Sequence, residues 1–106
     1  MKLVIAIVNN DDAHFVNTGL VSSGFHVTKI SSTGGFLMSG NSTFLLGVDE
    51  ENLDKVLEVI KTHSRQRIQS VPTLTGNPMM FNAADTTVKV GGATVFVIDV
   101  EKALRF

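Results

Sequence analysis

Hydroxyl-bearing side chains gather in one part of this 106-residue chain, and a hydroxyl is the simplest group that could act as a nucleophile. They are Ser31, Ser32, Thr33, Ser39, Ser42 and Thr43. An active serine needs a base beside it and an acid that orients the base. No carboxylate lies between Ser22 and Val48, and no Gly-x-Ser-x-Gly motif occurs. The sequence therefore predicts that the protein is not an enzyme.

The three histidines, His14, His26 and His63, are the first metal-ligand candidates in a chain that has no cysteine. None has a second histidine or a carboxylate three or four residues later, as a metal site on one helix would require. His14 and His63 fall on polar parts of two predicted helices, where exposed or charge-compensating histidines are common. We therefore expect no metal site and no cofactor, and His26 alone remains a candidate for ligand binding.

The other candidate residues are suited to binding. Gly34 and Gly35 would let a ligand approach backbone N–H groups closely, although a plain hairpin turn would also explain them. Thr28 and Asn41 carry polar groups that could meet the edge of a base. Two aromatic rings and three cations complete the set: Phe36, Phe96, His26, Lys29 and Arg105. The apolar run after the glycines, 36–38, fits either a subunit contact or a ligand site.

Apolar periodicity predicts the elements that position these residues. Strands are expected over 2–8, 25–33, 42–48 and 86–100, the second with a bulge between Thr28 and Ile30 and the last broken at Gly91–Gly92. Helices are expected over 12–23, ending at Gly24, and over 49–65, capped by Asp49. The order is βαββαβ, the ferredoxin-like arrangement of the α+β class, with a four-stranded antiparallel sheet and two helices on one face.

The chain, 1–106, is interpreted as a single domain with two distinctive loops. One is a short hairpin loop at about 34–41, and the other is a long, flexible loop at about 66–85 without apolar period. The apolar strands leave one sheet face uncovered, so we expect self-association into a closed ring. The net charge of −1 gives no attraction to nucleic acid or to an anionic membrane, and we expect a cytoplasmic protein.

Three segments together form a specific pattern: MKLVIAIV at the start, TKISSTGGFLMSGNSTFLLGV from Thr28 to Val48, and VKVGGATVFVI from Val88 to Ile98. Through them the chain resembles the PstA or DarA family of PII-like cyclic di-AMP receptors over nearly its whole length. The resemblance implies a PII-like homotrimer in bacterial signal transduction. It also implies that this second messenger binds in clefts between subunits and orders the long loop. It leaves any downstream protein partner unidentified.

Position by position, the family's ligand contacts fall on seven residues: Thr28, Gly35, Phe36, Leu37, Asn41, Gly47 and Phe96. The resemblance implies that Phe36 and Leu37 cover a face of adenine. Thr28 and Asn41 would meet the edges of the base or the phosphates. At Gly47 the missing side chain would let the backbone come close to a base.

This chain departs from the family in two places along the sequence. Its relatives carry Asn-Phe-Arg where Gly24-Phe25-His26 stands, and Gln where Arg105 stands. Histidine cannot make the forked phosphate contact of arginine, whereas Arg105 could return the lost charge, so both His26 and Arg105 are predicted ligand-binding residues. The alternative left open is a PII-like binding module for another nucleotide or anion. An acylphosphatase-like enzyme would need an arginine near the first strand, where the sequence NNDDAH supplies none.

Overall fold

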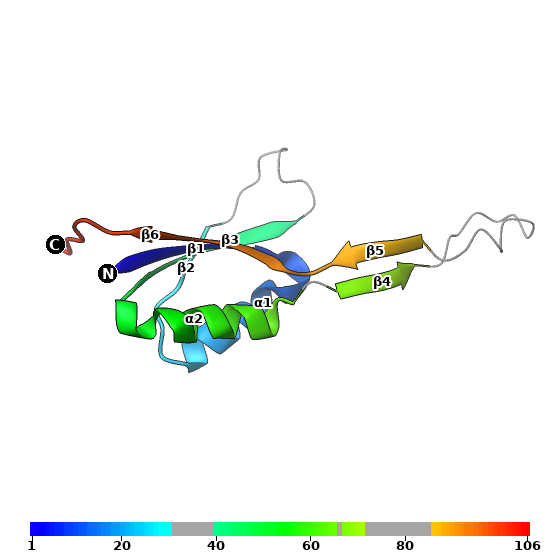
Figure 1. The fold of residues 1–106 in the computed structure, drawn as a ribbon, viewed down its shortest axis with the longest axis horizontal. Helices are drawn as coiled ribbons and strands as arrows, with labels where there is room; N and C mark the ends of the chain where they lie inside the picture. The colour runs from blue at the N-terminus through cyan, green and yellow to red at the C-terminus, as the bar shows by residue number, and fades with distance from the viewer. Residues whose placement is uncertain (31–39, 66, 72–85) are drawn as a thin grey trace, which may run out of the picture.

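A computed structural model describes residues 1–30, 40–65, 67–71 and 86–106. Four of its strands form one antiparallel sheet in the order β2-β3-β1-β6. Their bounds are Thr28–Ile30 for β2, Asn41–Val48 for β3, Lys2–Asn9 for β1 and Ala93–Asp99 for β6. Figure 1 shows both chain termini at one end of this sheet and a separate two-stranded hairpin beyond the other end.

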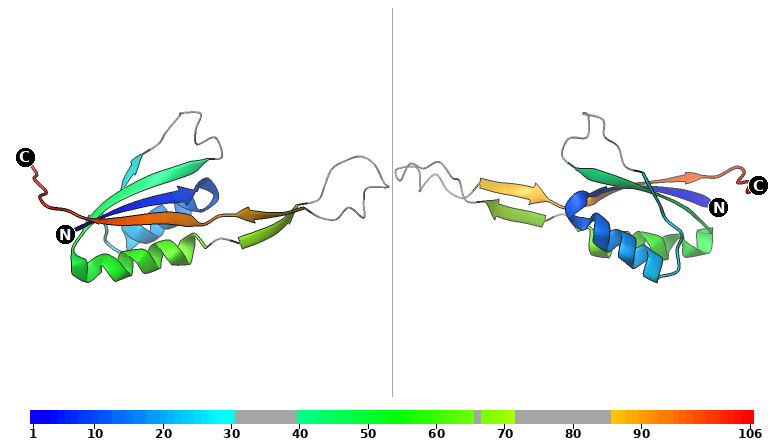
Figure 2. Two further views of the ribbon diagram at one scale, coloured as in Figure 1. Left: turned by 45° about the horizontal axis from the view of Figure 1, so that its top comes forward. Right: turned by 180° about the vertical axis from the view of Figure 1, so that it is seen from behind.

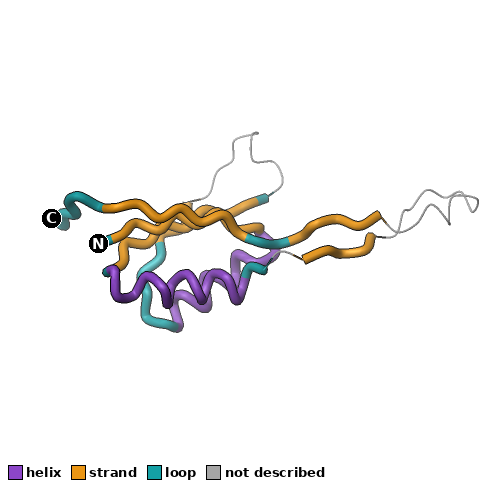
Figure 3. The backbone as a smooth tube through the Cα atoms, in the orientation of Figure 1, coloured by secondary structure: helices purple, strands orange, loops and turns teal. Residues whose placement is uncertain are grey.

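Two helices, α1 (Asn10–Ser22) and α2 (Glu50–His63), cover one face of the sheet. The turned views in Figure 2 and the tube in Figure 3 show the helices as a single layer beside the strands. Alternate residues of the two central strands are buried beneath them: Val4, Ala6, Val8, Phe44, Leu46 and Val48. The helices contribute Ala13, Val16, Leu20, Val56 and Ile60 to the same core. The predicted βαββαβ order and its α+β class are confirmed.

The ends of α1 follow from local hydrogen bonding. The Asn9 side chain accepts a hydrogen bond from the Asp11 backbone N–H at 2.9 Å and so caps the helix start. At the other end the N–H of Gly24 donates to Val21 O and the N–H of Phe25 donates to Leu20 O, both at 3.0 Å. This pair of bonds is a Schellman motif, and Gly24 supplies the positive φ of 90° that the motif needs.

Gly19 has a low helix propensity, but it allows α1 and α2 to pack closely. A Cβ atom at this position would lie 3.0 Å from Val59 Cγ1 and 3.2 Å from His63 Nε2, so α1 and α2 approach closely there. His63 is half-buried against this crossing, and its Nδ1 lies 3.2 Å from Val59 O. Of the two expected roles, His63 fits the charge-compensating one, because it lies in the last turn of α2, and His14 is exposed as predicted.

The structure corrects the predicted loop at 66–85 in part. Residues Arg67–Val71 form a strand, β4, which pairs antiparallel with β5, Thr86–Val90. The local sequence pattern of β4 is too weak to predict a strand. The strand forms because it pairs with a segment far along the chain. Residues 72–85 lie outside the described residues. The predicted break at Gly91–Gly92 is confirmed, since both glycines have positive φ and separate β5 from β6.

The structure also differs from three smaller expectations about local structure. The predicted bulge in the second strand is absent from its described part, where Thr28, Lys29 and Ile30 pair in regular register with β3. The strand also starts later than expected, at Thr28. Asp49 does stand at the start of α2, but its side chain makes no capping hydrogen bond there. Acidic residues in the first turn still suit the helix dipole at that end.

Candidate functional site

The helix-free face of the sheet carries four of the predicted site residues. Thr28 of β2 pairs with Leu45 of β3. Leu45 in turn pairs with Ile5 of β1, and Ile5 pairs with Phe96 of β6. These residues form one row across the sheet. Large apolar side chains on this face are about half exposed: Ile30 at 45%, Phe96 at 52% and Ile98 at 49%.

The row separates Thr28 and Phe96 widely within one chain. The two residues lie on the two edge strands of the sheet, with β3 and β1 between them. Three strand spacings of about 4.8 Å place them roughly 14 Å apart. Asn41 and Gly47 are also distant from each other, because six strand residues span roughly 20 Å. The predicted residues therefore mark out an extended face and do not converge on a single pocket.

Asn41, a predicted site residue, borders two concavities of the structure. It is the first residue of β3, lies opposite Asn9 of β1, and is half-buried. One concavity, the hairpin-end groove, has a volume of about 600 Å³ and lies between the end of α2 and the start of β6. Its lining comprises Ile7, Asn9, Asn41, Leu57, Ile60, Lys61, Ser64, Arg65, Gly91, Gly92, Ala93, Thr94 and Val95.

The hairpin-end groove contains two cations that sequence reasoning did not assign to a site. Lys61 and Arg65 lie at the C-terminal end of α2 and are exposed. Lys61 in the last turn of α2 complements the negative end of the helix dipole. The available signal was the spacing of four residues within the predicted helix 49–65, which would place both cations on one side of it. In the structure α2 ends at His63, so Arg65 lies just beyond the helix. The groove can therefore present positive charge close to Asn41.

A second concavity, the α1 groove, has a volume of about 430 Å³. Its lining is mostly polar and comprises Asn10, Ala13, His14, Asn17, Lys29, Asn41, Ser42 and Phe44. Lys29 belongs here because it lies opposite Phe44, on the helix side of the sheet, whereas its neighbour Thr28 lies on the other face. The structure therefore separates Lys29 from the helix-free row.

Gly47 lies on the helix-free face opposite Leu3 and is exposed. The nearest atom to a Cβ at this position would be Met1 Sδ at 3.8 Å, an ordinary van der Waals distance. Neither its backbone conformation nor its surroundings within the chain require glycine. The contrast with Gly40 is clear, because Gly40 has a φ of 75° and a Cβ there would lie 2.7 Å from Asn10 Nδ2.

The remaining predicted residues divide into two groups. His26, between α1 and β2, and Arg105, in the tail after β6, are both exposed. Arg105 follows the strand end that pairs with Lys2, so it lies at the end of the sheet opposite Asn41. Gly35, Phe36 and Leu37, together with the short loop at 34–39 that holds them, lie outside the described residues.

The clearest electrostatic interaction is an ion pair at the end of the sheet where the termini lie. Lys2 Nζ donates to Asp99 Oδ1 across the β1–β6 register. The hydrogen bond and charge of Lys2 lower the pKa of Asp99, and Asp99 in turn raises the pKa of Lys2. Since the Asp99 side chain is 83% exposed, water screens this pair and its effect on stability is small.

The described residues give two findings, one about metal sites and one about membrane-spanning helices. Within them, no group of three or more His, Asp or Glu side chains is arranged to hold a metal ion. Among the described helices, none is long and apolar enough to cross a membrane.

The comparisons with known proteins agree with this geometry. A family model described as cyclic-di-AMP receptor matches residues 1–106. The crystal structure of a functionally unknown protein from Pediococcus pentosaceus ATCC 25745 is 41% identical to this chain, with a TM-score of 0.76. The match covers 99% of this chain and 96% of that one. The family match extends over the full length and favours cyclic di-AMP over another nucleotide or anion as the ligand. This chain belongs to the cyclic-di-AMP receptor family, whose members include the DarA and PstA proteins, and it is a binding protein for cyclic di-AMP.

Proposed function

We propose that cyclic di-AMP binds between neighbouring copies of this chain in a homotrimer, in a cleft built from opposite edges of two sheets. The observation that carries this proposal is the row from Thr28 to Phe96. Its ends lie roughly 14 Å apart across the sheet. A single adenine cannot reach both ends within one chain, but the β2 edge of one subunit and the β6 edge of the next can meet around it.

The exposed apolar face supports self-association. Phe96 and Ile98 of β6 and Ile30 of β2 are large side chains left about half exposed on a face that no helix covers. Burying such a side chain contributes roughly 1.5–3 kcal/mol relative to leaving it in water. A closed ring would bury equivalent patches from every copy and leave no sheet edge open to further association.

Within this cleft the residues have separate roles. Phe96 stacks on a base, Thr28 and Asn41 hydrogen-bond to polar edges or phosphate oxygens, and Gly47 leaves space for the ring. The open space around Gly47 supports its role, because none of the described residues around it accounts for a glycine there. Gly35, Phe36 and Leu37 are proposed to cover the other face of the base. His26 and Arg105 are proposed phosphate contacts, and both are exposed and accessible.

We further propose that the protein leaves cyclic di-AMP chemically unchanged, acts in the cytoplasm and signals through residues 66–85. Cyclic di-AMP recovered intact after prolonged incubation with the protein would support the first point. Cell fractionation tests the second. A change of amide exchange in this segment on ligand addition tests the third.

Mixing two defective variants tests whether the cleft lies between subunits. Thr28→Ala and Phe96→Ala each damage one edge, so homotrimers of either variant should bind cyclic di-AMP at least tenfold more weakly in calorimetry. If the two edges come from different subunits, a refolded equal mixture regains intact clefts. Random assembly gives about one quarter of the sites both wild-type edges.

The stoichiometry decides the outcome. Wild-type protein should bind about one cyclic di-AMP per chain and should sediment as a trimer. The mixture should show a high-affinity fraction close to one quarter of that stoichiometry. No recovery in the mixture, with wild type binding normally, would place both contacts on one chain and refute the shared cleft. Absence of trimers in wild type would refute it independently.

A further inference from the structure

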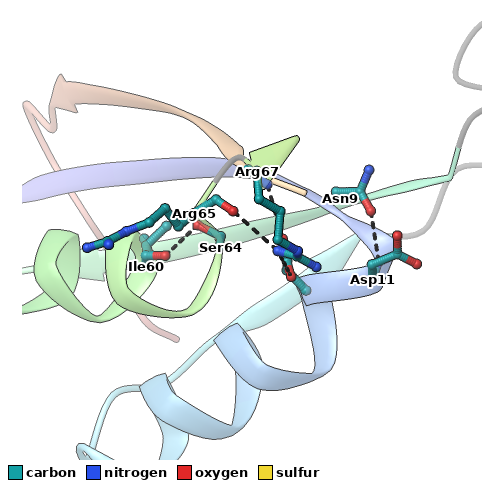
Figure 4. A network of polar contacts seen from close by, with 8 residues as sticks. Asn9, Asp11, Ile60, Ser64, Arg65 and Arg67 are labelled. Atoms are coloured by element: carbon teal, nitrogen blue, oxygen red, sulfur yellow. Dashed lines mark hydrogen bonds and ion pairs between the residues drawn. The ribbon is translucent and has the colours of Figure 1, made fainter. Parts of the chain in front are cut away.

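The first turn of α1 contacts two segments that lie far apart in the sequence. This turn, residues 9–12, reads Asn-Asn-Asp-Asp, and such residues commonly cap a helix. Asn9 does cap it, as the bond to Asp11 in Figure 4 shows. The neighbouring residues make further bonds, on one side to the base of the β2–β3 loop and on the other to the junction of β5 and β6. The turn therefore connects two parts of the protein that have no strand pairing between them.

Asp12 holds the β5–β6 junction and the start of β4. Arg67 Nη1 donates to Asp12 Oδ1 at 3.1 Å, and the Gly92 backbone N–H donates to Asp12 Oδ2 at 3.0 Å. The Asp12 side chain is only 5% exposed. Figure 4 shows Arg67 reaching toward this turn, where its Nη1 also donates to Arg65 O at 3.2 Å. A buried carboxylate needs such partners, since its charge would otherwise be left unsatisfied.

The backbone of the two junction glycines, Gly91 and Gly92, packs closely against the Asp12 carboxylate. Gly91 has a φ of 76°, and a Cβ there would lie 2.5 Å from Asp12 Oδ2 and 2.6 Å from Arg67 Nη1. Gly92 is held on both sides, because its carbonyl also accepts a hydrogen bond from the Asn9 N–H at 3.2 Å. Both strands of the β4–β5 hairpin are thus fixed to one side chain, β4 through Arg67 and β5 through the junction that follows it.

Asn10 holds the other segment. Its N–H donates to Gly40 O at 2.8 Å, and its Oδ1 accepts a hydrogen bond from Ser42 Oγ at 2.7 Å. Gly40 is pressed against the Asn10 side chain, with only 2.7 Å between Nδ2 and a Cβ placed there. Gly40 and Ser42 flank Asn41, the proposed ligand contact. Any shift of Asn41 that moves its neighbours therefore also moves Asn10.

We propose that the turn 9–12 couples the ligand site at Asn41 to the orientation of the β4–β5 hairpin, with Asp12 as the positioning residue. Asn10 and Asp12 belong to the same helical turn, whose backbone hydrogen bonds make it move as one unit. A ligand that displaces Asn41 thus alters the Asp12 contacts, and the hairpin orientation alters ligand affinity by the same factor. The proposal rests on the proposed function only in taking Asn41 as a ligand contact.

The first test uses no ligand. Asp12→Asn keeps the shape of the side chain, but one of its two positions becomes an N–H that faces Arg67 or the Gly92 N–H. Hydrogen–deuterium exchange of amides 67–71 and 86–90 should rise about tenfold as the hairpin loosens. Asp11→Asn is the matched control, because it removes the same charge from an exposed neighbour in the same turn. It should change these rates less than about twofold.

The coupling itself is tested from the opposite side of the turn. Ser42→Ala removes the hydroxyl that binds Asn10, and it should raise exchange in the hairpin strands at least threefold. Ser22→Ala deletes a hydroxyl at the far end of α1, where Ser22 Oγ donates to Thr18 O, and should leave the hairpin unchanged. Hairpin exchange equal in Ser42→Ala and Ser22→Ala would overturn the proposal, as would an Asp12→Asn variant that matches Asp11→Asn.

The second test adds cyclic di-AMP. Saturating ligand should change hairpin exchange in wild type and in Asp11→Asn, whereas in Asp12→Asn the change should fall to less than half. Asp12→Asn should still bind, with an affinity changed by the same factor as the hairpin equilibrium. A full ligand response in Asp12→Asn refutes the coupling. A wild-type protein that fails to bind cyclic di-AMP refutes the proposed function instead, and the ligand-free arm still decides the coupling.

Discussion

Gly47→Ala separates what the fold requires from what the ligand requires. Gly47 lies within β3, opposite Leu3, with φ outside the region reserved for glycine. An added Cβ would meet only Met1 Sδ, at 3.8 Å. Glycine within a strand costs roughly 0.5–1 kcal/mol relative to alanine, because the unfolded chain has more freedom to lose. The alanine variant should therefore unfold at a denaturant concentration equal to or above that of wild type.

Affinity should change in the opposite direction. If a base lies against the Gly47 backbone, the new methyl group occupies part of its volume, and a loss of about tenfold in cyclic di-AMP affinity corresponds to 1.4 kcal/mol. Urea unfolding and calorimetry on the same preparation measure the two quantities. Few substitutions raise stability and lower affinity together, so the combination is diagnostic.

Gly40→Ala is the matched control for this prediction. Its φ of 75° disfavours alanine, and the methyl group would press on Asn10 Nδ2 at 2.7 Å. This variant should lose roughly 1–3 kcal/mol of unfolding free energy. The reasoning about Gly47 fails if Gly47→Ala is destabilised to a similar extent, or if it is stable and binds cyclic di-AMP as tightly as wild type does.

Three other substitutions give sharp expectations. Asn41→Ala should weaken cyclic di-AMP binding by roughly 1–3 kcal/mol, because a polar partner in the ligand loses its hydrogen bond; calorimetry showing unchanged affinity would contradict this role. Phe44→Ala should lower the unfolding free energy by about 3–5 kcal/mol, since Phe44 is the largest fully buried side chain, and a loss below 1 kcal/mol in urea unfolding would contradict the assigned core. Asp99→Asn removes a carboxylate whose pKa is lowered in the folded protein, so the stability difference from wild type should be present above pH 3.8 and should vanish as pH falls through the lowered pKa. Melting curves at pH 3 and pH 6 measure that difference, and an equal difference at both values would show that Asp99 acts through something other than its charge.

The elements that could be predicted are those whose structure is determined by residues close together in the sequence. Strong apolar runs or periods mark β1, β3 and α2, and each of these elements contributes buried residues to the core. The Schellman end of α1 at Gly24 was also predictable, because it depends on one glycine and the residues just before it. Each of these signals lies within about one turn or one strand of the chain.

The hairpin of β4 and β5 could not be predicted in this way. The register pairs Arg67 with Val90 and Val71 with Thr86, so each strand finds its partner many residues away. The prediction of a strand over 86–100 covers β5, but β4 has no clean alternation that would identify it alone. The strand became visible only through its pairing, which is a property of the folded chain. The same reason explains why the bonds of Asp12 to Arg67 and Gly92 could not be predicted.

For the candidate site too, the sequence predicted which residues to consider but not how the fold arranges them. Residue types and family pattern selected the helix-free face, where Thr28, Asn41, Gly47 and Phe96 all lie. They did not reveal that Thr28 and Phe96 stand at opposite edges, because edge positions depend on strand order. They also missed Lys61 and Arg65 in the hairpin-end groove, since a cation at the end of a helix already has a sufficient local explanation.

In the proposed coupling, the buried charge of Asp12 connects ligand binding to a change elsewhere in the protein. Most of this chain is a sheet and two helices joined by an apolar core, which resists graded movement. Asp12 is an exception, because it is a buried charged side chain whose bonds reach both Arg67 and Gly92. Polar contacts of this kind have discrete alternatives, with water or with other donors, and packed methyl groups do not. A ligand therefore needs to bias only this small set of bonds for its binding to reach the hairpin, while the core remains unchanged.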